Sequence, residues 1–104
     1  MDPSLYRVET FQPHVNSRFD ASLPDGSTLP LVLTEVHLVQ SNEKVTQFSL
    51  LFRGPATPLV RQQTLRLDHA QLGQMDFFLV PIGADADGVS YEAVFSRFVS
   101  PAAR

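Results

Sequence analysis

The chain has 104 residues, 43% of them hydrophobic, and it carries 8 Lys and Arg against 11 Asp and Glu, for a net charge of −3. A chain of this length supports one domain with a core of its own. The absence of cysteine excludes disulfide frameworks and thiol nucleophiles, and the acidic balance argues against a nucleic-acid partner, which would need a basic face.

Residues 1–17 show no regular hydrophobic period, and Pro3 and Pro13 interrupt them. We expect an N-terminal arm with at most one helical turn, packed on a single β domain over residues 18–100. The chain does not begin with basic residues, and it has no apolar run long enough for a signal segment or a membrane span. These features predict a cytoplasmic protein without membrane insertion.

Alternating side chains in the first half of the chain predict three strands. Residues 18–23 alternate apolar and polar side chains, and residues 24–27 supply the Pro and Gly of a tight turn. Residues 29–39 change the phase of their alternation, with Val36 and Leu38 continuing the apolar set, which predicts a β-bulge near Thr34 and Glu35. A turn over residues 40–44 then leads into a third strand over residues 45–53.

The second half predicts three more strands. Residues 62–68 alternate as a fourth strand, and residues 69–73 are typical of one helical turn closed by Gly73. Residues 77–82 and 89–96 predict a final hairpin across the segment 83–88. The first of these strands is apolar on both faces, which favours a central position, whereas Pro81 argues against one because proline cannot donate to a ladder.

The pattern as a whole predicts an all-β fold of about six antiparallel strands. Consecutive strands are expected to pair, giving a meander that curls into a small barrel or a two-layer roll. The predicted inner side chains are Phe19, Leu23, Leu31, Leu33, Phe48, Leu50, Phe52, Leu65, Leu67, Phe77, Leu79, Tyr91 and Phe95.

Recognised catalytic and metal motifs are missing from the sequence, which has no Gly-x-Ser-x-Gly elbow, no His-Glu-x-x-His pair and no Gly-rich phosphate loop. We interpret His14, His37 and His69 as surface or capping residues, with a three-histidine zinc site as the alternative. The segment 83–88 has two acids and a Gly of a calcium loop but lacks both essential end ligands, so we interpret it as a hairpin tip, with weak surface calcium binding as the alternative. We therefore expect no metal and no cofactor.

The strand-borne acids Asp20, Glu35, Asp68 and Glu92 all fall on predicted polar faces. Arginines at positions 53, 66 and 97 can pair with them across neighbouring strands. We interpret these groups as surface ion pairs rather than as acid and base catalysts.

One set of apolar side chains is predicted to point away from the core. If Phe77 and Leu79 point inward, alternation turns their neighbours outward. The predicted binding residues on this outer face are Leu51, Phe78, Val80, Ile82 and Val94. Either the arm, through Leu5, Tyr6, Val8 and Phe11, or another protein chain must cover such a patch.

Four motifs follow one another in the chain: FSLLFRGP at residues 48–55, LG at 72–73, FLVPIG at 78–83 and YEAVF at 91–95. This ordered set resembles a family of small bacterial proteins catalogued as a domain of unknown function, and the resemblance runs over about residues 11–95. Relatives in that family often lie near genes for phage-tail-collar-like proteins, and they often have an aromatic residue where Leu65 stands. The resemblance implies no catalytic residues.

For function, the sequence favours a non-enzymatic binding or assembly module, accessory to a phage-tail-like or surface assembly. A protein partner or a homo-oligomer is then expected on the outer face. The alternative is a small-ligand-binding barrel, or an enzyme whose active-site residues are scattered along the chain.

Overall fold

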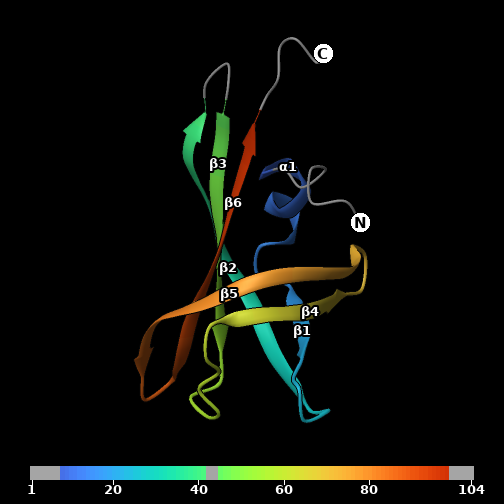
Figure 1. Ribbon diagram of the computed structural model, residues 1–104, viewed down its shortest axis with the longest axis vertical. Coiled ribbons are helices and arrows are strands. Elements are labelled where there is room, and N and C mark those ends of the chain that lie inside the picture. Colours follow the sequence, from blue (N-terminus) through green and yellow to red (C-terminus); the bar gives the residue numbers. More distant parts are fainter. Residues whose placement is uncertain (1–7, 42–44, 99–104) are drawn as a thin grey trace.

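The computed structural model describes residues 8–41 and 45–98, and it is built almost entirely from strands (Figure 1). A short N-terminal segment contains α1 and η2, and six strands follow. The elements are α1 (Val8–Phe11), η2 (Gln12–His14), β1 (Arg18–Ser22), β2 (Thr28–Ser41), β3 (Val45–Gly54), β4 (Gln63–His69), β5 (Gly73–Asp85) and β6 (Gly88–Phe98). In the described residues no helix is long and apolar enough to cross a membrane.

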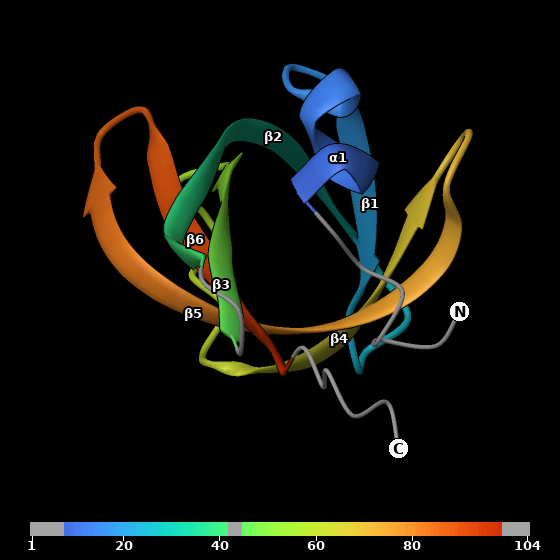
Figure 2. The same cartoon turned by 90° about the horizontal axis from the view of Figure 1, so that it is seen from above.

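The six strands close into one antiparallel barrel in the order β1-β2-β3-β6-β5-β4, with β4 returning to β1 (Figures 1 and 2). The all-β prediction is confirmed, and of the two predicted forms, a small barrel or a two-layer roll, the sheet takes the barrel. The expected simple meander is wrong at one connection, between β3 and β4. Because β3 pairs with β6 along its whole length, from Val45↔Phe98 to Gly54↔Val89, β4 has no place beside it. Residues 55–62 therefore cross one end of the barrel to reach β4.

Bulges bend the two longest strands, β2 and β5, and each of them pairs with one neighbour along its first part and with another along its second part. The register of β2 shifts between Leu33 and Glu35, where the change of phase predicted it, and again between Leu38 and Gln40. β5 pairs with β4 over residues 73–79 and with β6 over residues 80–85, and its register shifts between Pro81 and Gly83. A bulge is one of the few places where a sheet accepts proline. This explains how β5 lies between two strands and still contains Pro81.

The predicted inner side chains fill the barrel. All of them are buried except Leu23 and Phe95, which are partly buried and pack against the core. Val36 also packs on the core, but Leu38 is 52% exposed, although its cross-strand partner Phe48 is buried. Leu38 lies in the C-terminal part of β2, at the second register shift between Leu38 and Gln40.

The N-terminal segment closes one end of the barrel from inside. Phe11 is fully buried, with its ring centroid 6.2, 5.8 and 6.2 Å from those of Phe48, Phe77 and Phe95. Figure 2 shows α1 beside β1 and β2 on this side of the molecule. Phe11 therefore belongs to the core and does not cover the outer apolar face, as an arm packed on that face would require. It packs inside the barrel because three aromatic rings contact it there. Leu5 and Tyr6 lie outside the described residues.

The turns are tighter than the sequence suggested. Residues 70–72 join β4 to β5 as a three-residue hairpin, with His69 opposite Gly73, and the predicted helical turn is wrong. Gly73 has φ +82°, a conformation that closes three-residue hairpins as readily as it ends helices. β5 and β6 extend to Asp85 and Gly88, leaving a two-residue turn. β2 extends through Ser41, and residues 42–44 of the turn predicted over 40–44 lie outside the described residues.

Candidate functional site

The outer apolar face is assembled from three adjacent strands. β6 lies between β3 and β5, so side chains from all three can share one surface. Both Leu51 of β3 and Val80 of β5 are register partners of Glu92 on β6, so these three residues form a row across the sheet. The outer apolar face consists of Leu51, Phe78, Val80, Ile82 and Val94.

Three side chains of this face are open to solvent. Phe78, Ile82 and Val94 are each 53% exposed, while Leu51 and Val80 are half-buried between their neighbours. Exposed apolar side chains occur singly on most proteins, but a group of large ones on adjacent strands is typical of an interaction surface. The face therefore has the composition of a docking surface.

Glu92 adds one charge to the middle of the outer apolar face. Its side chain is half-buried, and within the described residues no hydrogen bond or ion pair reaches its carboxylate. Sequence reasoning placed Glu92 on a polar face and missed this role. The row depends on the bulge at Pro81, which shifts Val80 into register with Glu92, and no sequence pattern indicated that shift.

Three of the predicted strand charges, Asp20, Glu35 and Arg53, pair with partners other than the predicted ones. Asp20 binds Arg18 on its own strand at 2.6 Å, and Glu35 lies 3.5 Å from His37. Arg53 binds Asp85, which sequence reasoning had placed in a turn, and donates a second hydrogen bond to Ser90 Oγ at 2.9 Å. These are surface pairs, as interpreted, but two of them form within one strand and the third joins β3 to the end of β5.

The hairpin tip at residues 85–88 uses its acid to hold its own turn. Asp85 Oδ1 accepts the N–H groups of Asp87 at 2.8 Å and Gly88 at 3.0 Å. The Asp87 N–H and the Arg53 guanidinium lower the pKa of Asp85. An added Cβ at Gly88 would overlap the carbonyl oxygen of Gly54, so the backbones of β3 and β6 approach closely there. Asp85 thus has the turn and Arg53 as partners, and the described residues contain no group of three or more metal-ligating side chains.

Two of the three histidines meet beside the N-terminal segment. The ring centroids of His14 on η2 and His69 at the end of β4 are 4.6 Å apart, and that of Phe19 lies 4.5 Å from His69. His69 is only 7% exposed. His37 is exposed on β2 and pairs with Glu35, so the structure does not bring the three histidines together.

The hydrogen bonds around His69 determine which ring nitrogen carries the proton. Nδ1 accepts the backbone N–H groups of Gln71 at 3.0 Å and Leu72 at 3.1 Å, so it has no hydrogen of its own. The neutral ring therefore carries its hydrogen on Nε2 and donates it to Ser17 Oγ at 2.9 Å. Ser17 in turn donates to the His14 carbonyl oxygen at 2.5 Å.

This chain of donors runs opposite to that of a catalytic serine. An activated serine donates its proton to an unprotonated histidine nitrogen, whereas Ser17 receives one from His69. The contact between Ser17 and His69 is a structural link between the N-terminal segment and the β4–β5 turn. Burial, followed by the charge of His14, lowers the pKa of His69 and favours this neutral form.

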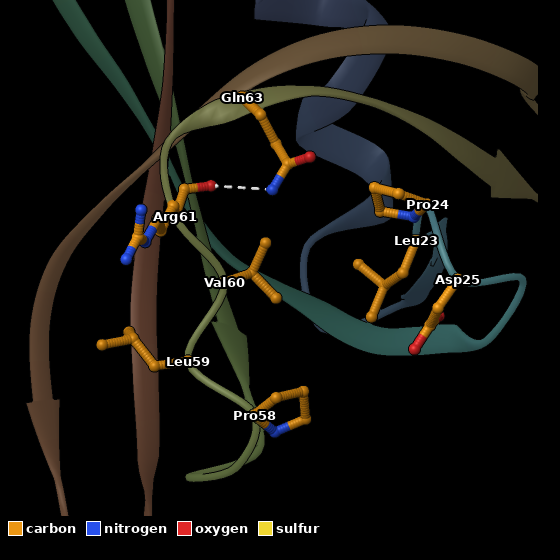
Figure 3. Close-up of a pocket in the computed structure, with 8 residues that line it drawn as sticks. All are labelled: Leu23, Pro24, Asp25, Pro58, Leu59, Val60, Arg61 and Gln63. Carbon is orange, nitrogen blue, oxygen red and sulfur yellow. Dashed lines mark hydrogen bonds between the residues drawn. The ribbon is translucent and has the colours of Figure 1, made fainter.

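A shallow groove of about 320 Å³ lies at the end of the barrel crossed by residues 55–62. Figure 3 shows Pro58 and Val60 facing Leu23 and Pro24 across it, while the Leu59 and Arg61 side chains point to the other side. Gln63 Nε2 donates to the Arg61 carbonyl oxygen at 3.2 Å. The walls that face each other are mainly apolar, with Asp25 and Gln63 at their edges, and the groove is open to solvent rather than enclosed by the barrel.

Comparison with known proteins gives one family. Neither the curated proteins nor the solved structures yield a match to this chain. The family described as a domain of unknown function (DUF6916) matches residues 6–95, nearly the same span as the resemblance over residues 11–95. The chain is therefore a member of the DUF6916 family.

Proposed function

We propose that this protein is a non-enzymatic binding module that docks a heterologous protein partner on its outer apolar face. The observation that carries the proposal is the exposure of Phe78, Ile82 and Val94 around the half-buried carboxylate of Glu92, which has no hydrogen-bond or ion-pair partner among the described residues. A packed aromatic core supports the same conclusion, because the interior of the barrel is occupied by the protein's own side chains.

Glu92 specifies the chemistry of the partner. A carboxylate at the centre of an apolar contact loses water on binding and needs a cation opposite it. Arg is the residue that interfaces use most often for this purpose, because its apolar stem packs while its guanidinium pairs. We therefore expect a partner surface with one Arg or Lys surrounded by apolar side chains.

The same carboxylate argues against a second copy of this chain as the occupant. A symmetric dimer presents the same patch from both subunits. Centred on this face, it would bring two Glu92 carboxylates together without a cation between them. A heterologous partner avoids that repulsion.

An accessory role in a phage-tail-like or surface assembly in the bacterial cytoplasm is the setting we propose for this module. Such assemblies join many different subunits, and a small barrel with an apolar docking face suits an accessory subunit bound to one of them. The recurring gene neighbourhood implied by the family resemblance supports this setting.

Site-specific photo-crosslinking in the native cells tests the docking face. A photoreactive residue at position 78 should give a crosslinked adduct with another protein, and one at position 59, where Leu59 is similarly exposed, should not. Glu92→Arg should abolish the adduct, whereas Glu92→Gln should weaken it. Equal adducts at both positions, or a homodimer in light scattering that Phe78→Ser abolishes, would overturn the proposal.

A second candidate function rests on the groove in Figure 3, whose volume of about 320 Å³ falls at the lower end of small-molecule sites. Its facing walls are mainly apolar, so it would take a small apolar ligand. Chemical-shift changes confined to Leu23, Pro24, Pro58 and Val60 in a screen of apolar fragments would favour it over the docking face.

A further inference from the structure

The contact between the β4–β5 turn and the N-terminal segment depends on the protonation of one side chain. We propose that His69 is a pH-sensitive latch. When neutral it fastens the β4–β5 turn to the η2–β1 corner, residues 15–17, and when protonated it releases the turn. This goes beyond the docking face, which lies on β3, β5 and β6 and uses neither His69 nor the β4–β5 turn.

The turn is held by the lone pair of a ring nitrogen. His69 Nδ1 accepts both the Gln71 and the Leu72 N–H groups, a role that Asp or Asn commonly fills before a turn. A proton on Nδ1 removes this acceptor and points a donor at two other donors. Both backbone bonds must then break, because the protonated ring has no acceptor left.

The other side of the ring faces the N-terminal segment. Nε2–H donates to Ser17 Oγ, and the ring packs against those of His14 and Phe19. His14 is the titratable group in contact with His69, so a charge on both rings repels. Charged neighbours on the packed strands alternate to the opposite face: Arg18, Asp20 and Asp68.

The part that moves is the turn, because the corner is anchored independently. Asn16 N–H donates to the Leu33 carbonyl at 2.6 Å, and Leu33 N–H donates to the Ser17 carbonyl at 3.1 Å. Neither bond involves a titratable group. Protonation therefore frees residues 70–72 and uncovers Leu72, which packs on the core in the closed state.

The direction of the effect follows from the position of the ring. Burial and His14 lower the pKa of His69 below its ordinary value of 6.5. When the turn opens, the ring regains water and its ordinary affinity for a proton. As the pH falls below 6.5, protons bind the open state preferentially, so the open fraction grows with acidity until the closed ring also titrates.

Amide hydrogen exchange on the whole protein tests the latch. Protection at Gln71 and Leu72, corrected for intrinsic exchange, should be constant near pH 7.5 and fall about tenfold for each pH unit below 6.5. The Asn16 and Val60 amides, which bond to Leu33 and Tyr91, should keep their protection over the same range. Protection that is unchanged at Gln71 and Leu72, or lost equally at all four amides, overturns the proposal.

Two variants sharpen the test. His69→Asn keeps an acceptor for the turn but does not titrate near neutrality, so the Gln71 and Leu72 amides should stay protected both near pH 7.5 and below pH 6.5. His37→Asn removes an exposed histidine elsewhere and should behave like the unmodified protein. If His69→Asn does not fold, the exchange measurement on the unmodified protein still decides, because it needs no variant. A pH dependence that persists in folded His69→Asn overturns the proposal.

Discussion

The two ends of this barrel are closed by different chemistry. At the N-terminal end Phe11 enters a cluster of aromatic rings, and the adjoining β4–β5 turn is held by the neutral ring of His69. At the other end residues 55–62 cross the opening, and buried Val60 donates its N–H to the Tyr91 hydroxyl at 3.1 Å. Both ends keep water from the core, but only the first depends on a group that titrates near neutral pH.

The largest expected effect comes from removing the aromatic side chain at the N-terminal end. Phe11→Ala leaves a cavity among Phe48, Phe77 and Phe95, and it should lower the free energy of unfolding by about 3–5 kcal/mol. Leu59→Ala, at an exposed position of the crossing segment, serves as control and should cost less than about 0.5 kcal/mol. Urea denaturation measures both, and equal losses would remove Phe11 from the core.

A substitution at the end crossed by residues 55–62 should lower the free energy of unfolding by less, because that end is held by a hydrogen bond rather than by a packed aromatic ring. Tyr91→Phe keeps the ring and removes the hydroxyl, which leaves the buried Val60 N–H without an acceptor. An unsatisfied buried donor costs about 1–3 kcal/mol. Urea denaturation near pH 7.5 should show this loss, whereas a variant as stable as the unmodified protein would mean that water replaces the hydroxyl.

A substitution at Gly73, in the turn beside His69, tests the N-terminal end of the barrel without changing an aromatic or imidazole side chain. Gly73 has φ +82°, and the space around a Cβ at that position is empty, so Gly73→Ala is penalised by the backbone conformation alone. The expected cost is about 1–2 kcal/mol. Gly83→Ala, where φ is ordinary and space is also open, is the matched control. If the two substitutions cost the same, the left-handed conformation at Gly73 contributes nothing measurable.

Sequence reasoning reached the core better than the connections, for a physical reason. Side chains such as Phe48, Leu50 and Phe52 alternate within one strand, so their burial is encoded locally. Which strand lies beside β3 is decided by the whole sheet: β6 pairs with all of β3, and the crossing segment 55–62 has no pattern that announces it.

The candidate sites divide in the same way. Phe78, Ile82 and Val94 were predicted because alternation alone turns them outward, and each of them is 53% exposed. Glu92 was missed because its place between Leu51 and Val80 depends on the β5 bulge. The link between His69 and Ser17 joins residues 52 positions apart, beyond the reach of any local pattern.

The smallest expected effect is a difference between the two ends in how the free energy of unfolding depends on pH. The pKa of His69 is lowered in the folded protein, so below 6.5 the unfolded chain binds a proton that the folded chain resists. The stability that neutral His69 confers is therefore complete above pH 6.5 and declines as the pH falls toward the lowered pKa. The unfolding free energy of Tyr91→Phe should decline in parallel with that of the unmodified protein between about pH 7.5 and 5.5, because the crossing end carries no histidine. That of His69→Asn should decline less, since the slope from this one site is absent, and urea titrations of all three proteins at the same pH values measure the difference. If all three lines are parallel, His69 does not set the pH response, and the two ends of the barrel respond alike.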